Sequence, residues 1–475
     1  MPLRSGRSGR GERSKRRASR ALAEAERPPN PGRWPAAPRP RGMKALLTAE
    51  IFLVLVGLIM LGLPIAVSMG LTAVFFFVAL GETEVLTMVP ARMYSSTTSF
   101  TLLAIPFFIL TGNLMNAGGI THRLFRFAQN LVGHFRGGLG HVVVVSAMIF
   151  AGMTGAAVAE AAALGTVQLE GMVKRGFDRK FSAAIVASAS TIGPVIPPSI
   201  PFVIYGSITG TSVGRLFLGG FVPGFIMGLA LMIIVYFVAR RRNYPRERRA
   251  TAGELLDSSL GAVSAVATPV IIIGGMVSGI FTPTEAAVAA TVYALILTLF
   301  VYREVRIRDL PQILWETLES SVRVLFIISA AGIFGWLLIH QRVPETVITG
   351  LMSLSHNPWV VLLIINVILL VLGCFMEGIC IMLLTIPVFM PVITRLGIDP
   401  VHFGVMMTLN LMVGLLTPPV GMVLYTLASI GKIPVWSLSH ELRWHLFALL
   451  TVLFLVTFVP GFVTFVPNLV MGSAR

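Results

Sequence analysis

A Gly-x-x-x-Pro-Pro motif occurs twice in the middle of long apolar segments, first as Gly193–Pro198 and again as Gly414–Pro419. Two adjacent prolines remove two backbone donors and clash with the preceding turn, so an α-helix has to unwind at each copy. Unwinding frees carbonyl oxygens, which can bind a cation such as Na⁺, and it creates half-helix N-termini, which favour an anion. A simple kink, which is common in membrane helices, is the alternative for each copy taken alone.

Each motif follows an apolar segment that is itself interrupted. Residues 138–173 contain a run of small residues that ends at Gly155, and residues 358–396 break between Gly373 and Gly378. The first motif proline follows these tips by 42 and 40 residues, respectively. Each interrupted segment is too long for one membrane crossing and too weakly flanked for two. We therefore predict two re-entrant helical hairpins, whose tips have to be buried or face a wet cavity.

Three acidic residues lie at or near the predicted membrane depth, where ionisable residues are functional candidates by default. Glu377 lies at the second hairpin tip and Glu160 lies just past the first. For both residues, attraction of an ion and structural pairing remain open. Glu285 follows a Thr-Pro-Thr helix-start pattern, which favours a capping role. Four further residues could line a polar path, with interhelical hydrogen bonding as the favoured alternative: Asn113, Arg323, Asn366 and Asn410.

The sequence lacks the motifs of the common enzyme and pump classes. It contains no Gly-x-x-x-x-Gly-Lys-Ser/Thr, His-Glu-x-x-His or Gly-x-Ser-x-Gly string, and its eight histidines are dispersed. The two cysteines, Cys374 and Cys380, share one apolar stretch and are interpreted as packing residues. Without a nucleotide site, uphill transport has to draw on an ion gradient. An enzyme is therefore not expected, and neither is a metal site or an organic cofactor.

The composition predicts an all-α polytopic membrane protein. The chain is 55% hydrophobic and only 12% charged, with a mean hydropathy of +0.84, so lipid has to solvate most of its surface. The apolar runs lack the period-two alternation of a membrane barrel. Residues 81–100 are interpreted as a polar stretch, and 121–136 as an amphipathic arm in the membrane plane. Membrane helices and hairpins are predicted at 45–62, 64–80, 101–117, 138–173, 182–211, 214–240, 258–280, 284–302, 322–340, 358–396, 400–430 and 444–467.

Charge sets the expected topology and marks the N-terminal segment as separate. Residues 1–42 carry 12 Lys/Arg and 3 Asp/Glu, are rich in Pro, Gly and Ser, and cannot bury a core. We interpret them as a disordered basic extension, or as a mis-assigned start with Met43 as the natural one. Binding to nucleic acid or to anionic lipid is the alternative for such a tail, and nucleic acid is not an expected partner. Basic loops near 123–136, 174–180, 240–249 and 303–308 all become cytoplasmic if the first hairpin enters and leaves on one side.

Two halves with opposite topology, each with a hairpin followed by an interrupted helix, indicate an inverted repeat. The transporter domain is predicted at 43–470. The first repeat covers about 101–240, with hairpin 138–173 and broken helix 182–211. The second repeat covers about 258–467, with hairpin 358–396 and broken helix 400–430.

Several longer strings resemble the large membrane (M) subunit of tripartite ATP-independent periplasmic (TRAP) transporters. They are Ile105–Asn113, Ser190–Gly206, Gly279–Ala287 and Gly414–Gly421, and the likeness extends over about 43–470. The resemblance implies an elevator-type fold in which hairpins and broken helices move as one body against a scaffold. It implies two Na⁺ sites made mainly of backbone oxygens, with a solute between them. The implied cation-site residues are Gly152, Thr154, Gly155, Gly193, Pro197, Ser199, Gly373, Met376, Gly378, Gly414, Thr417 and Pro418.

The resemblance also implies partners and a location. A small four-helix membrane subunit and a periplasmic substrate-binding protein would work with this chain in the bacterial inner membrane, as a multi-pass component of a Na⁺ symporter. The solute would be a small organic anion with a carboxylate, such as a C4-dicarboxylate or a sialic acid. A stand-alone anion carrier or antiporter without a binding protein is the first alternative. A membrane-embedded enzyme or a non-transporting scaffold protein is the second.

Overall fold

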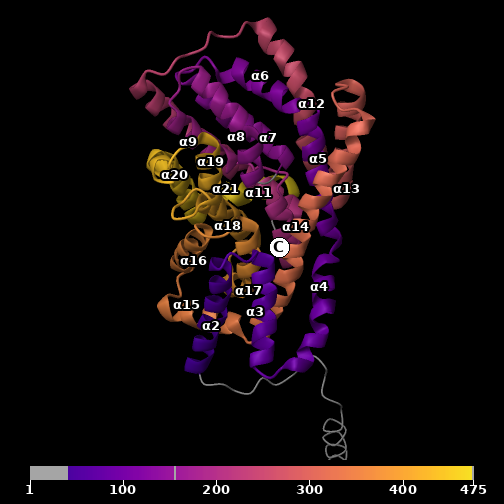
Figure 1. Cartoon of the computed structure of the whole chain (residues 1–475), viewed down its shortest axis with the longest axis vertical. Helices are drawn as coiled ribbons and strands as arrows, with labels where there is room; N and C mark the ends of the chain where they lie inside the picture. Colours follow the sequence, from indigo (N-terminus) through magenta and orange to yellow (C-terminus); the bar gives the residue numbers. More distant parts are fainter. Residues whose placement is uncertain (1–40, 155–156, 473–475) are drawn as a thin grey trace, which may run out of the picture.

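All regular structure in the described part of the chain is helical (Figure 1). The structure is a computed structural model that describes residues 41–154 and 157–472. By length and composition, seven of its described helices are long and apolar enough to cross a membrane, and nine shorter helices are also apolar. Large side chains such as Phe237, Phe447 and Phe454 are exposed on the outer surface, as expected where lipid replaces water. The predicted all-α class with many membrane-spanning helices is therefore confirmed.

The helices follow one another along nearly the whole described chain. They are α2 (Arg41–Met60), α3 (Ile65–Ala79), α4 (Val89–Thr97), α5 (Ala104–Ala117), α6 (Ile120–Val132), α7 (Gly138–Thr154), α8 (Ala157–Lys174), α9 (Arg179–Ser190), α10 (Ile200–Thr209), α11 (Val213–Arg242), α12 (Ala252–Val277), α13 (Pro283–Ile296), α14 (Leu310–His340), α15 (Val343–Leu354), α16 (Pro358–Gly373), α17 (Gly378–Arg395), α18 (Pro400–Gly414), α19 (Met422–Gly431), α20 (Val435–Phe458) and α21 (Gly461–Met471).

Polar caps define many of the helix starts. Asp178 accepts hydrogen bonds from the backbone N–H groups that open α9, and Asp399 does the same for α18. At α13, the Thr282 hydroxyl accepts from the Glu285 N–H, and the Glu285 carboxylate accepts from the Thr282 N–H at 2.8 Å. This reciprocal arrangement is a capping box. The predicted capping role of Glu285 is therefore confirmed.

Four boundaries differ from the sequence-based prediction. The segment 81–100, which was predicted to be a polar stretch, contains helix α4. The Arg and Ser residues of α4 lower its hydropathy, so the apolar pattern did not indicate a helix there. Helix α14 begins at Leu310 rather than at 322, since its first turns carry polar residues that extend the helix beyond its apolar part. Helix α15 was not predicted at all. The segment predicted at 444–467 begins earlier, as α20, and is divided before α21 at Val459, the residue before Pro460, where the backbone leaves the helix.

One group of helices forms a scaffold layer, in which α4, α5, α13 and α14 run along one side of the molecule (Figure 1). Helix α14 packs against α3, α4 and α5, and α13 packs against α5 and α12. Thr111 and Thr291 join α5 to α13 through hydroxyl oxygens 2.9 Å apart. Asn113 donates to the Thr317 hydroxyl at 2.9 Å and joins α5 to α14. Asn113 therefore acts as an interhelical hydrogen-bonding group, which was the favoured alternative to a polar path.

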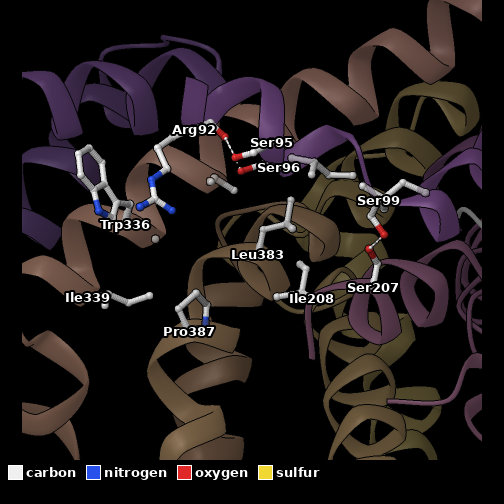
Figure 2. Close-up of a pocket in the computed structure, with 15 residues that line it drawn as sticks. Arg92, Ser95, Ser96, Ser99, Ser207, Ile208, Trp336, Ile339, Leu383 and Pro387 are labelled. Atoms are coloured by element: carbon white, nitrogen blue, oxygen red, sulfur yellow. Dashed lines mark hydrogen bonds between the residues drawn. The ribbon is translucent and has the colours of Figure 1, made fainter. Parts of the chain in front are cut away.

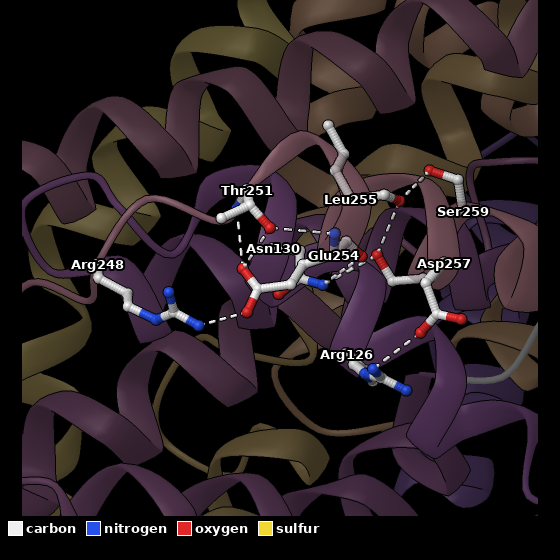
Figure 3. A network of polar contacts seen from close by, with 9 residues as sticks. Arg126, Asn130, Arg248, Thr251, Glu254, Leu255, Asp257 and Ser259 are labelled. Carbon is white, nitrogen blue, oxygen red and sulfur yellow. Dashed lines mark hydrogen bonds and ion pairs between the residues drawn. The ribbon is translucent and has the colours of Figure 1, made fainter.

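The predicted arm 121–136 is helix α6, which packs along α12 (Figure 3). Arg126 on α6 pairs with Asp257 on α12 at 2.9 Å. Asn130 donates to the Ser258 hydroxyl at 3.0 Å and to the Glu254 carbonyl oxygen at 3.1 Å. The polar face of α6 is thus bound to the start of α12, which fixes the orientation of the arm.

Helices α7–α11 and α16–α21 pack together, and we call this group the second body. Its earlier half, α7–α11, and its later half, α16–α21, are interleaved rather than separate. Helix α8 packs against α9 of its own half and against α19 of the other half, and α17 packs in the same way against α18 and α10. Helices α11 and α20 lie side by side and cover this body. The later helices, drawn in orange and yellow, accordingly lie against the earlier magenta ones (Figure 1).

Candidate functional site

The first Gly-x-x-x-Pro-Pro motif lies in a non-helical link between α9 and α10. We call this link, Thr191–Ser199, connection one; nearly all of its residues are buried. The Ser199 hydroxyl donates to the Pro194 carbonyl oxygen at 2.5 Å and accepts from the Phe202 N–H at 3.3 Å. Ser199 is thereby the N-cap of α10. The predicted cation ligand therefore has a structural role in starting the second half of the broken helix.

The hairpin formed by α7 and α8, called hairpin one, brings a carboxylate to connection one. Glu160 lies in the first turn of α8 and is only 2% exposed. A Cβ atom at Gly193 would lie 2.4 Å from Oε2 of Glu160. The carboxylate therefore lies directly against the backbone of the motif glycine, and any side chain at position 193 would have to displace it. A buried carboxyl group beside an unwound backbone is a combination suited to binding a cation.

Three of the predicted cation-site residues belong to the tip of hairpin one. Gly155 lies outside the residues that the structure describes. Gly152 and Thr154 are part of α7, but their surroundings are not described. Their roles therefore remain predictions.

The second motif begins with the last residue of α18 and continues into the link to α19, and we call Gly414–Gly421 connection two. Thr417 donates from its hydroxyl to the Val413 carbonyl oxygen of α18 at 2.9 Å. Thr417 and Pro418 are half-buried, whereas Pro419 is exposed. The α19 N-cap is Gly421, which carries no side chain to cap the helix. Connection two is therefore more exposed than connection one, and no side chain caps the helix that follows it.

The hairpin formed by α16 and α17, called hairpin two, contacts connection two through its backbone. A Cβ atom at Gly414 would lie 2.7 Å from the Gly373 Cα, and one at Gly373 would lie 2.9 Å from the Gly414 Cα. The N–H of Gly421 also donates to the carbonyl oxygen of Cys374 at 2.9 Å. The two glycines thus allow the backbones of hairpin two and connection two to touch without side chains between them. A backbone hydrogen bond also joins the tip of hairpin two to connection two.

The other predicted residues of hairpin two surround this contact. Met376 is buried at the tip, and a Cβ at Gly378 would contact the end of the Met412 side chain at 3.0 Å. Glu377 occupies the N-cap position of α17 without capping it, and its carboxylate accepts from the Cys380 thiol at 3.5 Å. The structure therefore places one carboxylate at each hairpin: Glu160 against the connection, and Glu377 at the tip.

Two of the suggested polar-path residues bond between helices. Asn410 is fully buried, and its side-chain N–H group donates to Oδ1 of Asn366 at 2.7 Å and to the Asn366 carbonyl oxygen at 3.0 Å. Asn366 in turn donates to the Thr457 hydroxyl at 3.0 Å, so the chain links α18, α16 and α20. Arg323 lies on an exposed face of α14 and pairs with Glu319 one turn away. None of these contacts joins the connections to the hairpins.

Sequence reasoning missed a cavity of about 340 Å³ between the scaffold and the second body (Figure 2). From the scaffold side, Arg92 lies over the Trp336 ring, with its guanidinium carbon 5.1 Å from the ring centroid. From the other side, Ser207 of α10 donates to the Ser99 hydroxyl at 2.9 Å. A guanidinium group and several hydroxyls are donors suited to a carboxylate. The signal was present as a polar stripe at helical spacing: Arg92, Ser95, Ser96 and Ser99.

Two broken helices, each packed against a hairpin, and a separate layer of long helices are the anatomy of a secondary membrane transporter. The sequence profile described as "Tripartite ATP-independent periplasmic transporter, DctM component" matches residues 52–462. The chain belongs to this family. It is a transporter permease and not an enzyme, and the resemblance noted in the sequence is confirmed.

Two relatives agree with this membership, and a solved structure shows a similar fold. The chain is 41% identical over 419 residues to the sialic acid TRAP transporter large permease protein SiaM of Vibrio cholerae, covering 88% of this chain and 98% of that protein. It is 41% identical over 378 residues to the C4-dicarboxylate TRAP transporter large permease protein DctM of Pseudomonas aeruginosa, covering 79% and 88%. The YdaH transporter of Alcanivorax borkumensis has a similar fold, with a TM-score of 0.58 and 14% identity over 81% of this chain and 90% of that one.

Proposed function

We propose that this chain carries a small carboxylate-bearing solute into the cell together with Na⁺, as the large membrane subunit of a tripartite importer. The observation that carries the proposal is the paired contact between each broken helix and its hairpin. Gly193 lies against the Glu160 carboxylate, and Gly414 lies against the Gly373 backbone. Each contact combines an unwound link with a hairpin whose carboxylate lies nearby.

In this proposal, one cation binds at each connection. At connection one, backbone oxygens of Gly193–Ser199 and of the hairpin-one tip are the ligands, and the nearby Glu160 charge favours the cation. At connection two, the ligands come from Gly373–Gly378 and Gly414–Thr417. Backbone oxygens suit a hard monovalent cation, since they supply partial negative charge without a full counter-ion. The bound cations and the half-helix N-termini then attract the carboxylate of the solute.

The cavity at Arg92 supports an anionic solute on the scaffold side of the same pathway. Its walls come from both bodies, so a shift of one body against the other changes its shape. Sialic acid and C4-dicarboxylates, the solutes in the names of the two relatives, both carry carboxylates. An arginine that is stacked on an aromatic ring keeps its donors available for such a group.

The packing also supports an inverted repeat and an elevator movement. If α3 corresponds to α13 and α5 to α14, the contact between α3 and α14 matches the contact between α13 and α5. If α8 corresponds to α17 and α10 to α19, the contact between α8 and α19 matches the contact between α17 and α10. In this proposal, α2–α11 form the first repeat and α12–α20 form the second, which would extend the first repeat to the N-terminal side of the predicted start at about residue 101. In the proposed movement, α7–α11 and α16–α21 slide against the scaffold.

A pair of cross-links tests the movement. Ser99 and Ser207 lie on opposite sides of the interface with hydroxyls 2.9 Å apart, and Thr111 and Thr291 lie at the same distance within the scaffold. In a background with both native cysteines replaced by serine, a Hg²⁺ bridge in Ser99→Cys/Ser207→Cys is expected to stop uptake, and thiol is expected to restore it. A bridge in Thr111→Cys/Thr291→Cys is expected to leave uptake unchanged. Normal uptake by the bridged interface pair would exclude the sliding movement.

The partners and the orientation follow from the same proposal. A periplasmic binding protein delivers the solute, and a small four-helix membrane subunit completes the complex in the bacterial inner membrane. The basic ends of α11 and α8 then face the cytoplasm by the positive-inside rule.

Uptake into proteoliposomes tests the function as a whole. The protein is reconstituted with its small subunit, and binding protein loaded with sialic acid or succinate is added outside, with and without an inward Na⁺ gradient. Uptake is expected only when both the gradient and the binding protein are present. Uptake that is indifferent to Na⁺ would remove the coupling, and uptake of free solute without the binding protein would favour a stand-alone carrier.

A further inference from the structure

A second cavity, of about 400 Å³, lies between the end of α11 and the first half of α20. Its lining includes Arg241, Arg242, Glu441, Arg443, Trp444 and His445. These residues come from two neighbouring helices at a basic helix end, and none of them takes part in the proposed transport path.

The lining carries a net positive charge. Arg242 pairs with Glu441 at 2.7 Å, and its guanidinium carbon also lies 5.5 Å from the centre of the Phe181 ring. This pair cancels one positive charge with the one negative charge in the lining. Arg241 and Arg443 remain exposed at the cavity, so two positive charges are left without an acidic partner in the lining. An anion is therefore the complementary ligand.

The floor of the cavity also offers a buried donor. His445 is only 1% exposed, and its ring has a weak contact with the Glu441 backbone but no hydrogen bond of normal geometry at either nitrogen. A buried polar group without a partner is costly, and a ligand oxygen would satisfy it. His445 thus adds a hydrogen-bonding position to the two arginines.

Exposed aromatic side chains lie at the cavity and elsewhere on the two helices that form it. Trp444 is 51% exposed beside the Arg443 guanidinium, and Phe237 and Phe447 are 60% and 63% exposed on the same two helices. A tryptophan next to arginines at a helix end is typical of the membrane interface, where acyl chains begin. A ligand with an anionic head and an apolar body fits this combination better than a free ion does.

We propose that this cavity binds the headgroup of an anionic phospholipid. The phosphate accepts from Arg241, Arg443 and His445, and the acyl chains lie along Phe237 and Phe447. Basic pockets between membrane helices hold such headgroups by charge and bidentate hydrogen bonds. Because α11 and α20 belong to the body that contains both broken helices, the lipid binds to the part that carries the connections.

Native mass spectrometry of the purified full-length protein tests the proposal. Phosphatidylglycerol and phosphatidylcholine with the same acyl chains are titrated separately, together with a third arm that contains inorganic phosphate alone. Phosphatidylglycerol is expected to bind at least tenfold more tightly than phosphatidylcholine. In Arg241→Gln/Arg443→Gln, its affinity is expected to fall about thirtyfold, since each basic side chain at an anionic surface contributes roughly fivefold.

A matched control removes the same charge elsewhere. Arg246→Gln/Arg249→Gln changes two exposed arginines that do not line the cavity and is expected to keep the wild-type affinity. Arg241→Lys/Arg443→Lys keeps the charge and is expected to lose only the part of the phosphatidylglycerol affinity that comes from bidentate hydrogen bonds. Equal binding of the two lipids to the wild type, or equal losses in the glutamine pair and its control, would overturn the proposal. Inorganic phosphate that binds as tightly as the lipid would assign the cavity to a soluble anion and overturn it too.

Discussion

The two connections contain the same six-residue pattern and are held in different ways. Connection one is almost wholly buried, starts its second half-helix with the Ser199 hydroxyl, and faces a carboxylate from hairpin one. Connection two is partly exposed, has no side-chain cap, and touches hairpin two through glycine backbones. The same motif thus interrupts both helices, but the neighbouring hairpin decides what each interruption faces.

The difference teaches that the two candidate cation sites depend on different interactions. At connection one, the buried Glu160 carboxyl group lies beside the backbone, so electrostatic attraction is expected to be the main contribution to cation binding. At connection two, the Gly373–Gly414 contact and the bond from Gly421 to Cys374 position backbone oxygens, so geometry is the main term. Changes of charge should therefore affect the first site more, and changes of volume should affect the second site more.

The largest effect is expected from a volume change at the glycine contact. In Gly414→Ala, the added Cβ meets the rigid backbone of Gly373, so the two segments have to separate, at a cost of roughly 1–3 kcal/mol. In Gly193→Ala, its closest contact is the end of the Glu160 side chain, which can move more easily than backbone. In Gly414→Ala, the unfolding temperature in detergent and the rate of uptake should both fall strongly. In Gly193→Ala, both should fall only slightly. Equal effects in the two variants would break the comparison.

A change of charge is expected to affect connection one more than connection two, the reverse of the order expected for a change of volume. Glu160→Gln removes the buried charge beside Gly193 and should raise the Na⁺ concentration for half-maximal uptake about tenfold, or about 1.4 kcal/mol. Glu377→Gln, at the tip of hairpin two, should raise it less than about threefold. The measurement is the Na⁺ dependence of uptake at saturating solute, with expression and unfolding temperature as controls. A larger shift in Glu377→Gln would reverse the assignment of the two sites.

Restoring a backbone donor tests the interruptions themselves. Pro197→Ala and Pro418→Ala each return an N–H group and remove the ring clash, so the helix can partly re-form. Na⁺-driven uptake should fall about fivefold for Pro197, which is buried, and about twofold for Pro418, which is half-buried. Membrane insertion, followed by extraction and size-exclusion profile, should stay normal. Wild-type uptake by both variants would show that unwinding at the motif is not needed for transport.

The smallest effect is expected from the hydroxyls. Ser199→Ala removes the N-cap of α10 and should cost about 1 kcal/mol of stability. Thr417→Ala removes a hydroxyl that donates to the Val413 carbonyl oxygen, four residues earlier at the end of α18, and should cost less than about 0.5 kcal/mol. Chemical unfolding measures the stability, and the Na⁺ dependence of uptake separately reports a ligand role. A change in Na⁺ dependence without a change in stability would make the hydroxyl a cation ligand rather than a cap.

Features governed by local chemistry were predictable from the sequence. The Pro-Pro pairs located both interruptions, and the Thr-Pro-Thr-Glu string located the capping box of Glu285, because each effect acts within a few residues. Helix α4 and the start of α14 were missed, since their polar residues lower the hydropathy that identified the other helices. The role of Asn410 could not be chosen from the sequence, because its partner Asn366 lies on another helix.

By itself, the sequence determined where the helices of this protein have to break and that lipid surrounds most of its surface, because proline geometry and side-chain hydropathy are properties of the local chain. Only the tertiary structure decided that Glu160 faces Gly193, that Gly373 touches Gly414, and that Arg92 shares a cavity with Ser207. These contacts join residues that are far apart in the sequence. They depend on how all the helices pack together, which no short segment encodes.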